Sequence, residues 1–414
     1  MDNVQGKVDS RAMREINRSI VLDIIRKGGR ISRTDLARRS ALTKPTVSAI
    51  VEDLLARGVV QEVGYGKAVG SGGRRARLLE FNDASAAYLG LRFGVSTTSV
   101  GVADARGELR ATTEVANVAG DPERSLHDAL GLIDQVLEAA KLPREVLRSV
   151  GVTVPGLVTQ SSGVVELAPN LGWESVPMRD MVQRALDLPV VVNNVTNAGA
   201  LAEGRAGAAR GVRSYVWVYV GTGIGAGIVI DGRVFNGHKG YSGEIGHCAV
   251  VLDGPKCTCG LRGCLEVMAS GWAIGRAGEL AVKSGEPTLL ANVQGPLDAR
   301  AVGEAAQAGD AVARRILADI GSYLGMGIST LVNLLDPELV VLGGGVMSAL
   351  DHIIDAARDS VAKHTLRRDR VPLVPSSLGD RFGLMGAVLA AMEHSVRSYR
   401  VVSTGERFAP VENA

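Results

Sequence analysis

Four side chains that could bind a metal ion lie close together in the sequence. Cys257, Cys259 and Cys264 fall within eight positions, and His247 lies ten residues before the first of them. Clustered cysteines in a chain without a secretory signal indicate metal ligands before disulfides. Three thiolates and one imidazole form a closed tetrahedral set, which is typical of structural zinc and leaves no place for a catalytic water. The pattern therefore predicts a structural zinc site, although the Cys-x-Cys spacing is tighter than in common zinc fingers.

Two clusters of glycine could bind phosphate. Residues 221–227 read GTGIGAG and join two predicted strands, and residues 343–345 read GGG after a third strand. Glycine permits tight turns and exposes backbone N–H groups that can hold a phosphate group. A crowded turn explains such clusters equally well, so taken alone they leave both interpretations open.

The elements around these residues alternate between strands and helices from residue 83 onward. Short β-branched runs predict strands at 88–93, 99–103, 150–154, 215–220, 227–230 and 339–342. Helices are predicted between them at 122–141, 196–207 and 311–334. This alternation predicts an α/β fold with largely buried sheets. With 4% aromatic residues and 52 glycines, the core must be built from small aliphatic side chains, with many close backbone contacts.

The first 80 residues differ from the rest in charge. They hold 16 lysines and arginines against 9 acidic residues, a net charge of +7, while the other 334 residues carry −5. Three helices are predicted within 11–58, and the first has apolar residues at helical spacing, namely Met13, Ile16, Ile20, Val21 and Ile24. Two short apolar runs with a long basic tip follow the helices, which predicts a winged helix-turn-helix.

Seven residues are candidates for contacts with DNA. They lie near the start of the third helix and in the predicted wing, and they are Thr43, Lys44, Thr46, Ser48, Lys67, Arg74 and Arg75. The start of a recognition helix reaches base edges, and basic wing residues reach phosphates. The alternative is a three-helix bundle with a solvated basic face. Helix spacing, capping residues, wing and charge together favour DNA binding.

The chain resembles the ROK (repressor, open reading frame, kinase) family. The resemblance covers nearly the whole chain and rests on GSGGRRARLLEFN, VPGLV, APNLGW, GTGIGAG, GEIGH, CTCGLRGCLE and VLGGGV. It implies a two-lobed, actin-like ATPase fold behind the winged helix of the repressor branch. The expected domains are the winged helix at 1–82, one lobe at 83–198 completed by a C-terminal helix at 383–397, and a second lobe at 199–382. It also assigns His247 and the three cysteines to structural zinc.

The same resemblance implies a sugar site. Asn194, Glu244, His247 and Glu266 match residues that the family uses on sugar hydroxyls, and Asn170 in APNLGW lies near the same cleft. Carboxylates, amides and imidazole suit hydroxyl groups because they form paired hydrogen bonds. For each residue the alternative is an ordinary polar group in a loop, and this alternative is strongest for Asn170.

Two carboxylates that carry the chemistry in the kinase branch are absent. The Asp of the Asp-x-Gly-Gly-Thr loop is replaced by Arg92, which cannot bind magnesium, and the general base is replaced by Val195, which cannot accept a proton. Loss of a general base alone reduces rates by about 10²–10⁴-fold. We therefore expect no kinase activity, with an active sugar kinase carrying a DNA-binding domain as the alternative. Arg92 could bind the phosphate of a phosphorylated sugar or form a structural ion pair, and the ion pair is the preferred expectation.

These observations predict a sugar-responsive transcriptional regulator, in the first instance a repressor. Its expected partners are operator DNA, a sugar or sugar-phosphate effector and further copies of the chain in a dimer or tetramer. A domain that only oligomerises and binds no ligand is a further alternative. The sequence has no run of eighteen apolar residues and its N-terminus has no apolar segment. We therefore expect no membrane span and no signal peptide, and a cytoplasmic protein.

Overall fold

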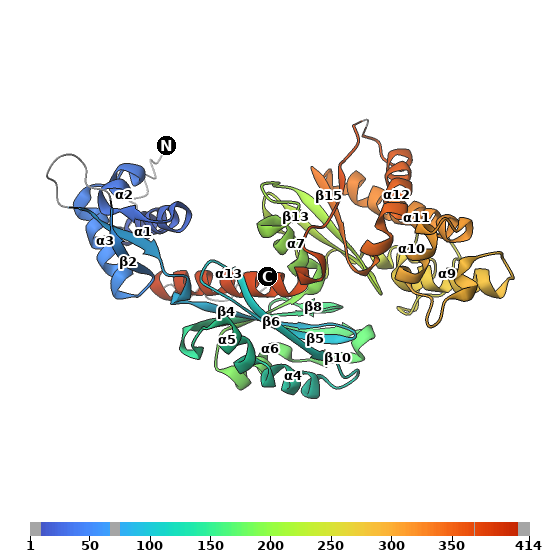
Figure 1. Cartoon of the computed structure of the whole chain (residues 1–414), viewed down its shortest axis with the longest axis horizontal. Helices are drawn as coiled ribbons and strands as arrows, with labels where there is room; N and C mark the ends of the chain where they lie inside the picture. Colours follow the sequence, from blue (N-terminus) through green and yellow to red (C-terminus); the bar gives the residue numbers. More distant parts are fainter. Residues whose placement is uncertain (1–9, 67–74, 368, 405–414) are drawn as a thin grey trace, which may run out of the picture.

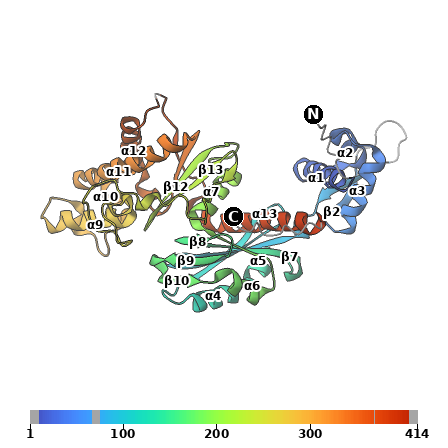
Figure 2. The same ribbon diagram turned by 180° about the vertical axis from the view of Figure 1, so that it is seen from behind.

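The computed structural model describes residues 10–66, 75–367 and 369–404. An N-terminal domain is followed by two lobes, and the first lobe lies between the other two bodies (Figure 1, Figure 2). Among the described helices, none is both long enough and apolar enough to cross a membrane.

The N-terminal domain is a winged helix-turn-helix, as predicted. Its elements are α1 (Ser10–Gly28), β1 (Ile31–Ser32), α2 (Arg33–Ser40), α3 (Lys44–Ala56), β2 (Val60–Tyr65) and β3 (Arg77–Phe81), with the sheet order β1-β3-β2. The Ser32 hydroxyl caps α2 by accepting a hydrogen bond from the Asp35 amide, and Thr43 caps α3 in the same way. Such caps stabilise a helix by about 1 kcal/mol each.

The apolar face predicted for α1 is buried only in part. Val21 and Ile25 are fully buried, but Met13, Ile16 and Ile20 are 46%, 51% and 39% exposed. The spacing correctly indicates a helix, but the core of this small domain contacts only the C-terminal half of that helix.

The first lobe contains a five-stranded sheet of order β11-β7-β4-β5-β6. Its strands are β4 (Ala87–Phe93), β5 (Thr97–Ala103), β6 (Leu109–Ala116), β7 (Leu147–Val154) and β11 (Val190–Asn194), and β4, β7 and β11 run parallel. A small antiparallel sheet is formed by β8 (Leu157–Thr159), β9 (Val164–Ala168) and β10 (Trp173–Val176). Three helices cover one face, namely α4 (Pro122–Gly131), α5 (Ile133–Ala140) and α6 (Met178–Leu186). The single helix predicted over 122–141 is therefore wrong in one respect, because Leu132 separates two helices.

The second lobe repeats this topology. Its sheet has the order β14-β13-β12-β15-β16, formed by β12 (Tyr215–Val220), β13 (Ile224–Ile230), β14 (Arg233–Val234), β15 (Leu339–Gly343) and β16 (Leu373–Pro375). Its helices are α7 (Val195–Ala206), α8 (Leu265–Ala269), α9 (Gly271–Lys283), α10 (Ala299–Gln307), α11 (Ala311–Leu335) and α12 (Leu350–His364). In both sheets an antiparallel hairpin continues into two parallel strands. The turn predicted over 221–227 is shorter than expected, because β13 already begins at Ile224.

Two helices connect the lobes. The last helix, α13 (Phe382–Thr404), lies across β4 and β7 of the first lobe and also contacts α7 (Figure 1). Gly151 of β7 allows this close approach, since a Cβ atom there would lie 1.9 Å from the Ala387 carbonyl oxygen. Helix α7 packs against the sheet of the second lobe through Ala200 and Ala202. The domain boundary predicted at residue 198 thus falls inside α7.

The turn between β5 and β6 joins the first lobe to the N-terminal domain. Ala105 in this turn belongs to the hydrophobic core of the winged helix. The neighbouring Arg106 stacks over the ring of Phe81, with its guanidinium carbon 5.3 Å from the ring centroid, and forms a salt bridge with Asp83. The two domains therefore share a core rather than a flexible linker.

Candidate functional site

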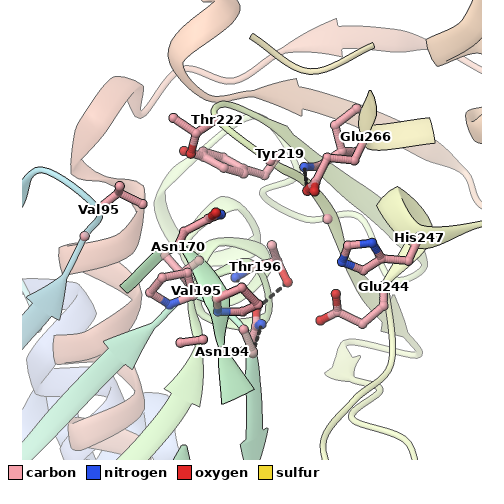
Figure 3. Close-up of a pocket in the computed structure, with 18 of the residues that line it drawn as sticks. Val95, Asn170, Asn194, Val195, Thr196, Tyr219, Thr222, Glu244, His247 and Glu266 are labelled. Atoms are coloured by element: carbon pink, nitrogen blue, oxygen red, sulfur yellow. Dashed lines mark hydrogen bonds between the residues drawn. The ribbon is translucent and has the colours of Figure 1, made fainter. Parts of the chain in front are cut away.

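A cavity between the two lobes collects the polar residues that the sequence singles out. Its empty space is about 930 Å³, part of which is open to solvent. All five predicted sugar-binding residues line it, namely Asn170, Asn194, Glu244, His247 and Glu266. In Figure 3 Glu244, His247 and Glu266 lie on one side of the cavity, and Asn170 and Asn194 on the other.

Asn194 is held by its own lobe. It ends β11 and caps α7, because its Oδ1 accepts hydrogen bonds from the amide and hydroxyl of Thr196. Its Nδ2 donates to the Gly156 carbonyl at 2.7 Å. The side chain is only 7% exposed, so its amide is fixed at the cavity wall with one donor hydrogen remaining.

Glycines position Glu244 and His247 in the GEIGH segment. Gly243 has a φ of +88°, and a Cβ atom there would lie 1.8 Å from the Ala226 carbonyl oxygen. A Cβ atom at Gly246 would lie 2.2 Å from the Ile224 carbonyl oxygen. Because only glycine fits these places, the segment lies directly on β13 and directs both polar side chains toward the cavity.

The two carboxylates of the cavity lie in different environments. Burial raises the pKa of the Glu244 carboxyl, His247 opposes this shift, and Glu266 adds to it. Glu266 itself accepts a hydrogen bond at 3.1 Å from the amide of Ile224, at the start of β13. A buried carboxylate beside a second one needs hydrogen-bond donors, which sugar hydroxyls can supply.

The predicted metal ligands come together. The ligand atoms of His247, Cys257, Cys259 and Cys264 all lie within 4.8 Å of one another. The Sγ atoms of Cys259 and Cys264 are 3.8 Å apart, and Cys257 Sγ is 3.8 Å from His247 Nδ1. Tetrahedral zinc with bonds of about 2.3 Å to sulfur requires sulfur atoms about 3.8 Å apart. This set therefore fits zinc.

The chemistry of the cysteines also fits a metal ion. Burial, together with the neighbouring thiols, raises the pKa of Cys264 to about 12. A thiol of this kind becomes a thiolate ligand only when a cation is bound beside it. The fourth cysteine, Cys248, is exposed and stays outside the cluster.

His247 belongs to both sites. Its Nδ1 faces the cysteines, while the residue also lines the cavity. A metal bound at Nδ1 would fix the ring and leave Nε2 for a hydrogen bond. The metal site can thus order the wall of the cavity.

The two positions at which the family resemblance leads us to expect kinase carboxylates also lie in the cavity wall. Val195, at the start of α7, and Arg92, near the end of β4, both line it. The expected ion pair of Arg92 is wrong: within the described part of the chain, Arg92 has neither a salt bridge nor a hydrogen bond, and its Nε is buried without a partner. Its guanidinium stacks on Phe382, 5.8 Å from the ring centroid.

Of the glycine-rich turns, the first reaches the cavity. Thr222 and Gly223 line the wall beside Tyr219. The Gly221 amide donates to the Gly223 carbonyl, so the turn is tight. The second turn has its middle residue, Gly344, at a φ of +112°, against the Val220 carbonyl oxygen. Close backbone packing therefore accounts for part of this glycine content.

Five of the seven residues predicted to contact DNA lie in the described part of the winged helix. Thr43 and Lys44 are exposed at the start of α3, and Thr46 and Ser48 are half-buried. The hydroxyls of Thr43 and Thr46 form a 2.8 Å hydrogen bond with each other. Arg75 is exposed just before β3, whereas Lys67 and Arg74 lie outside the described residues.

Comparison with known proteins agrees with this architecture. The ROK family model matches residues 88–394, and a winged helix-turn-helix DNA-binding model matches residues 14–61. The chain belongs to the ROK family. The xylose repressor of Caldicellulosiruptor bescii is 34% identical to this ROK protein over 384 residues, which are 91% of this chain and 95% of that repressor.

Two solved structures of ROK proteins resemble this one. A ROK family transcriptional regulator, described as a homologue of the Escherichia coli MLC protein, has a TM-score of 0.79 and 29% identity, and the match covers 94% of this chain and 99% of that one. A ROK glucokinase from Streptomyces griseus, in complex with glucose and AMPPNP, has a TM-score of 0.67 and 31% identity over 74% of this chain and 99% of its own. The regulator therefore matches the winged helix as well as the ROK domain.

Some residues of the cavity carry no signal in the sequence. Phe382 and Tyr219 line it but belong to apolar runs that read as ordinary core. Phe382 reaches the cavity because α13 returns to the first lobe almost 300 residues after β4. Spacing along the chain gives no indication of a contact over that distance.

Proposed function

We propose that this ROK protein is a transcriptional repressor whose winged helix binds operator DNA and whose cavity binds a sugar effector. The observation that supports this most is that the five side chains predicted to bind sugar hydroxyls all line one cavity at the junction of the lobes. The Caldicellulosiruptor relative is named a xylose repressor, and its match covers 91% of this chain, including the winged helix. This similarity favours the same function.

Sugar binding would act by closing the cavity. Asn170 and Asn194 belong to the first lobe, and Glu244 and Glu266 to the second, so a sugar held by both sets favours the closed arrangement. The strands β4 and β5 run from the cavity wall at Arg92 to the turn at Ala105, which lies in the winged-helix core. A change at the cavity can thus alter the position of the DNA-binding surface.

We propose further that the cavity does not transfer phosphate. Val195 cannot remove a proton from a sugar hydroxyl, and Arg92 cannot hold magnesium. Zinc held by His247 and the three cysteines would have a structural role, since four protein ligands leave no open position. Because His247 is shared, zinc would also order the effector site.

The proposed partners of the protein are a sugar effector, operator DNA and further copies of the chain. The name of the xylose repressor makes D-xylose the first effector to test. Two copies of the winged helix in a dimer or tetramer would recognise a pseudo-palindromic operator in the cytoplasm.

The test is a titration of the full-length protein with DNA from its own promoter region, with and without sugars. Fluorescence anisotropy should show DNA binding that weakens at higher salt and is released by one class of sugar. An Asn194→Ala variant should bind DNA but require far more sugar for release. If no sugar alters DNA binding, the proposal is wrong.

An active kinase is the second candidate, favoured by the 31% identity to a glucokinase. A coupled assay with ATP, magnesium and a panel of sugars separates the two functions. Sugar-dependent ADP formation that disappears in Asn194→Ala would establish the kinase. We expect ADP formation at the rate of the protein-free control.

A further inference from the structure

The two replaced kinase positions are adjacent in space. A Cβ atom added to Gly383 would lie 2.8 Å from Arg92 Cδ, 2.9 Å from Arg92 Nε and 3.2 Å from Val195 Cγ2. The guanidinium of Arg92 therefore lies beside the side chain that stands in place of the general base. A carboxylate at position 195 would be within reach of Arg92 and would neutralise it.

Arg92 is the one cation in the cavity wall that lacks a counter-charge among the described residues. Its Nε is buried without a hydrogen-bond partner. Gly94 lies on its other side, since a Cβ there would be 3.5 Å from Arg92 Nη1. Asp380, whose effect on the pKa of Tyr219 opposes that of Arg92, is exposed and forms no salt bridge with Arg92. A half-buried guanidinium without a partner is costly, which indicates that an anion completes the site.

The position of this charge defines the ligand. The family resemblance places the general base of a sugar kinase at position 195, and a general base must lie within hydrogen-bond reach of the hydroxyl that receives the phosphoryl group. With valine there and arginine beside it, that hydroxyl cannot be activated, but a phosphoryl group already attached to it would meet the guanidinium. Arginine binds phosphate through two parallel hydrogen bonds without a metal ion.

We propose that Arg92 binds an oxyanion on the effector, so that the cavity selects a sugar phosphate over the neutral sugar. This inference rests on the proposed function of the cavity as an effector site. Arginine at position 92 and valine at position 195 then act together. Val195 offers no carboxylate that could pair with Arg92, so the guanidinium is available to the ligand.

Calorimetry on the full-length protein tests this with xylose, xylose 5-phosphate, glucose, glucose 6-phosphate, glucuronate and inorganic phosphate. We expect a phosphorylated sugar to bind at least about tenfold more tightly than its neutral parent, the effect of one charged hydrogen-bonded pair. A preference for glucuronate instead would identify the oxyanion as a carboxylate. Titration with inorganic phosphate tests whether the site binds a free anion or only an anion that is attached to a sugar.

Variants decide whether Arg92 is responsible. Arg92→Met should abolish the preference for the anion, because it weakens binding of the phosphorylated sugar at least about tenfold more than binding of the neutral sugar, and it should not lower the melting temperature. Val195→Asp should also abolish the preference, because the new carboxylate pairs with Arg92. Arg276→Met is the matched control, since Arg276 also stacks on an aromatic ring, that of Trp272, but lies outside the cavity lining.

The outcomes separate this inference from the proposed function. If neutral sugars release DNA and phosphorylated ones bind no better, only the oxyanion site is wrong. The oxyanion site is also wrong if Arg92→Met retains the preference for the phosphorylated sugar. If the variant retains this preference and has a lower melting temperature, Arg92 has a structural role. If neither form of any sugar binds, the effector function fails and the oxyanion site fails with it.

Discussion

Arg106 donates a hydrogen bond of 2.8 Å from Nη1 to the carbonyl oxygen of Arg26, eighty residues earlier in the chain. The carbonyl belongs to the last turn of α1, and Arg106 lies in the turn after β5. Cations are favoured at helix C-termini, where carbonyl groups lack partners. This contact connects the sheet that borders the cavity to the DNA-binding domain.

We expect Arg106→Ala to weaken communication between the two sites. DNA affinity without effector and sugar affinity should change little, but saturating sugar should reduce DNA affinity less than in the parent protein. Coupling of this kind usually amounts to about 5–150-fold. Anisotropy titrations with and without effector measure it. Arg144→Ala, which removes an exposed salt bridge with Asp134 in the same lobe, is the control, and equal coupling in both variants would contradict the prediction.

Lys44→Ala should reduce affinity for every DNA sequence by a similar factor. Lys44 is exposed at the start of α3, and we expect its charge to contact a phosphate while the hydroxyls beside it reach the base edges. The slope of log affinity against log salt should become shallower by about 1. Lys283→Ala removes the same charge from α9 in the second lobe and should leave the slope unchanged.

Removal of the metal ligands should abolish sugar binding and spare the winged helix. Cys257→Ser should lower the zinc content measured by atomic emission from one ion per chain to none. Sugar-dependent release should then be lost, while DNA binding without sugar persists. Cys248→Ser, at the cysteine outside the cluster, should retain both zinc and sugar response. Normal sugar affinity in a zinc-free Cys257→Ser protein would disprove the coupling through His247.

Gly151→Ala should destabilise the first lobe strongly. The added methyl group meets the backbone of α13 at 1.9 Å, so the helix must move away from the sheet. Overpacking of this kind costs about 1–3 kcal/mol, which lowers the melting temperature by several degrees. Gly131→Ala in α4 meets nothing within 4 Å and should be neutral or stabilising, by up to about 1 kcal/mol.

The sequence predicts the architecture and the polar residues that line the cavity. Each of these residues lies in a short motif that also contains a glycine or adjoins a predicted strand. Glu244 and His247 are predicted from the resemblance of one short segment to the ROK family, and the cysteines from their spacing. The surroundings of Arg92 could not be predicted in this way. Its surroundings are set by Gly383 and Phe382 on a helix that returns from the far end of the chain. The half-exposed face of α1 has a similar cause, since periodicity identifies a helix but not how much of it a small core can cover.

The burial of Ala105 within the winged-helix core limits how this regulator can be divided. A fragment that ends at residue 82 has the complete DNA-binding motif in its sequence but leaves an apolar gap where the hairpin tip belongs. A functional transplant of this DNA-binding domain onto another kinase-like sensor must therefore carry the tip of the β5–β6 hairpin with it. The shared core also links the evolution of the winged helix and the first lobe, because a substitution in this core must be tolerated by both domains.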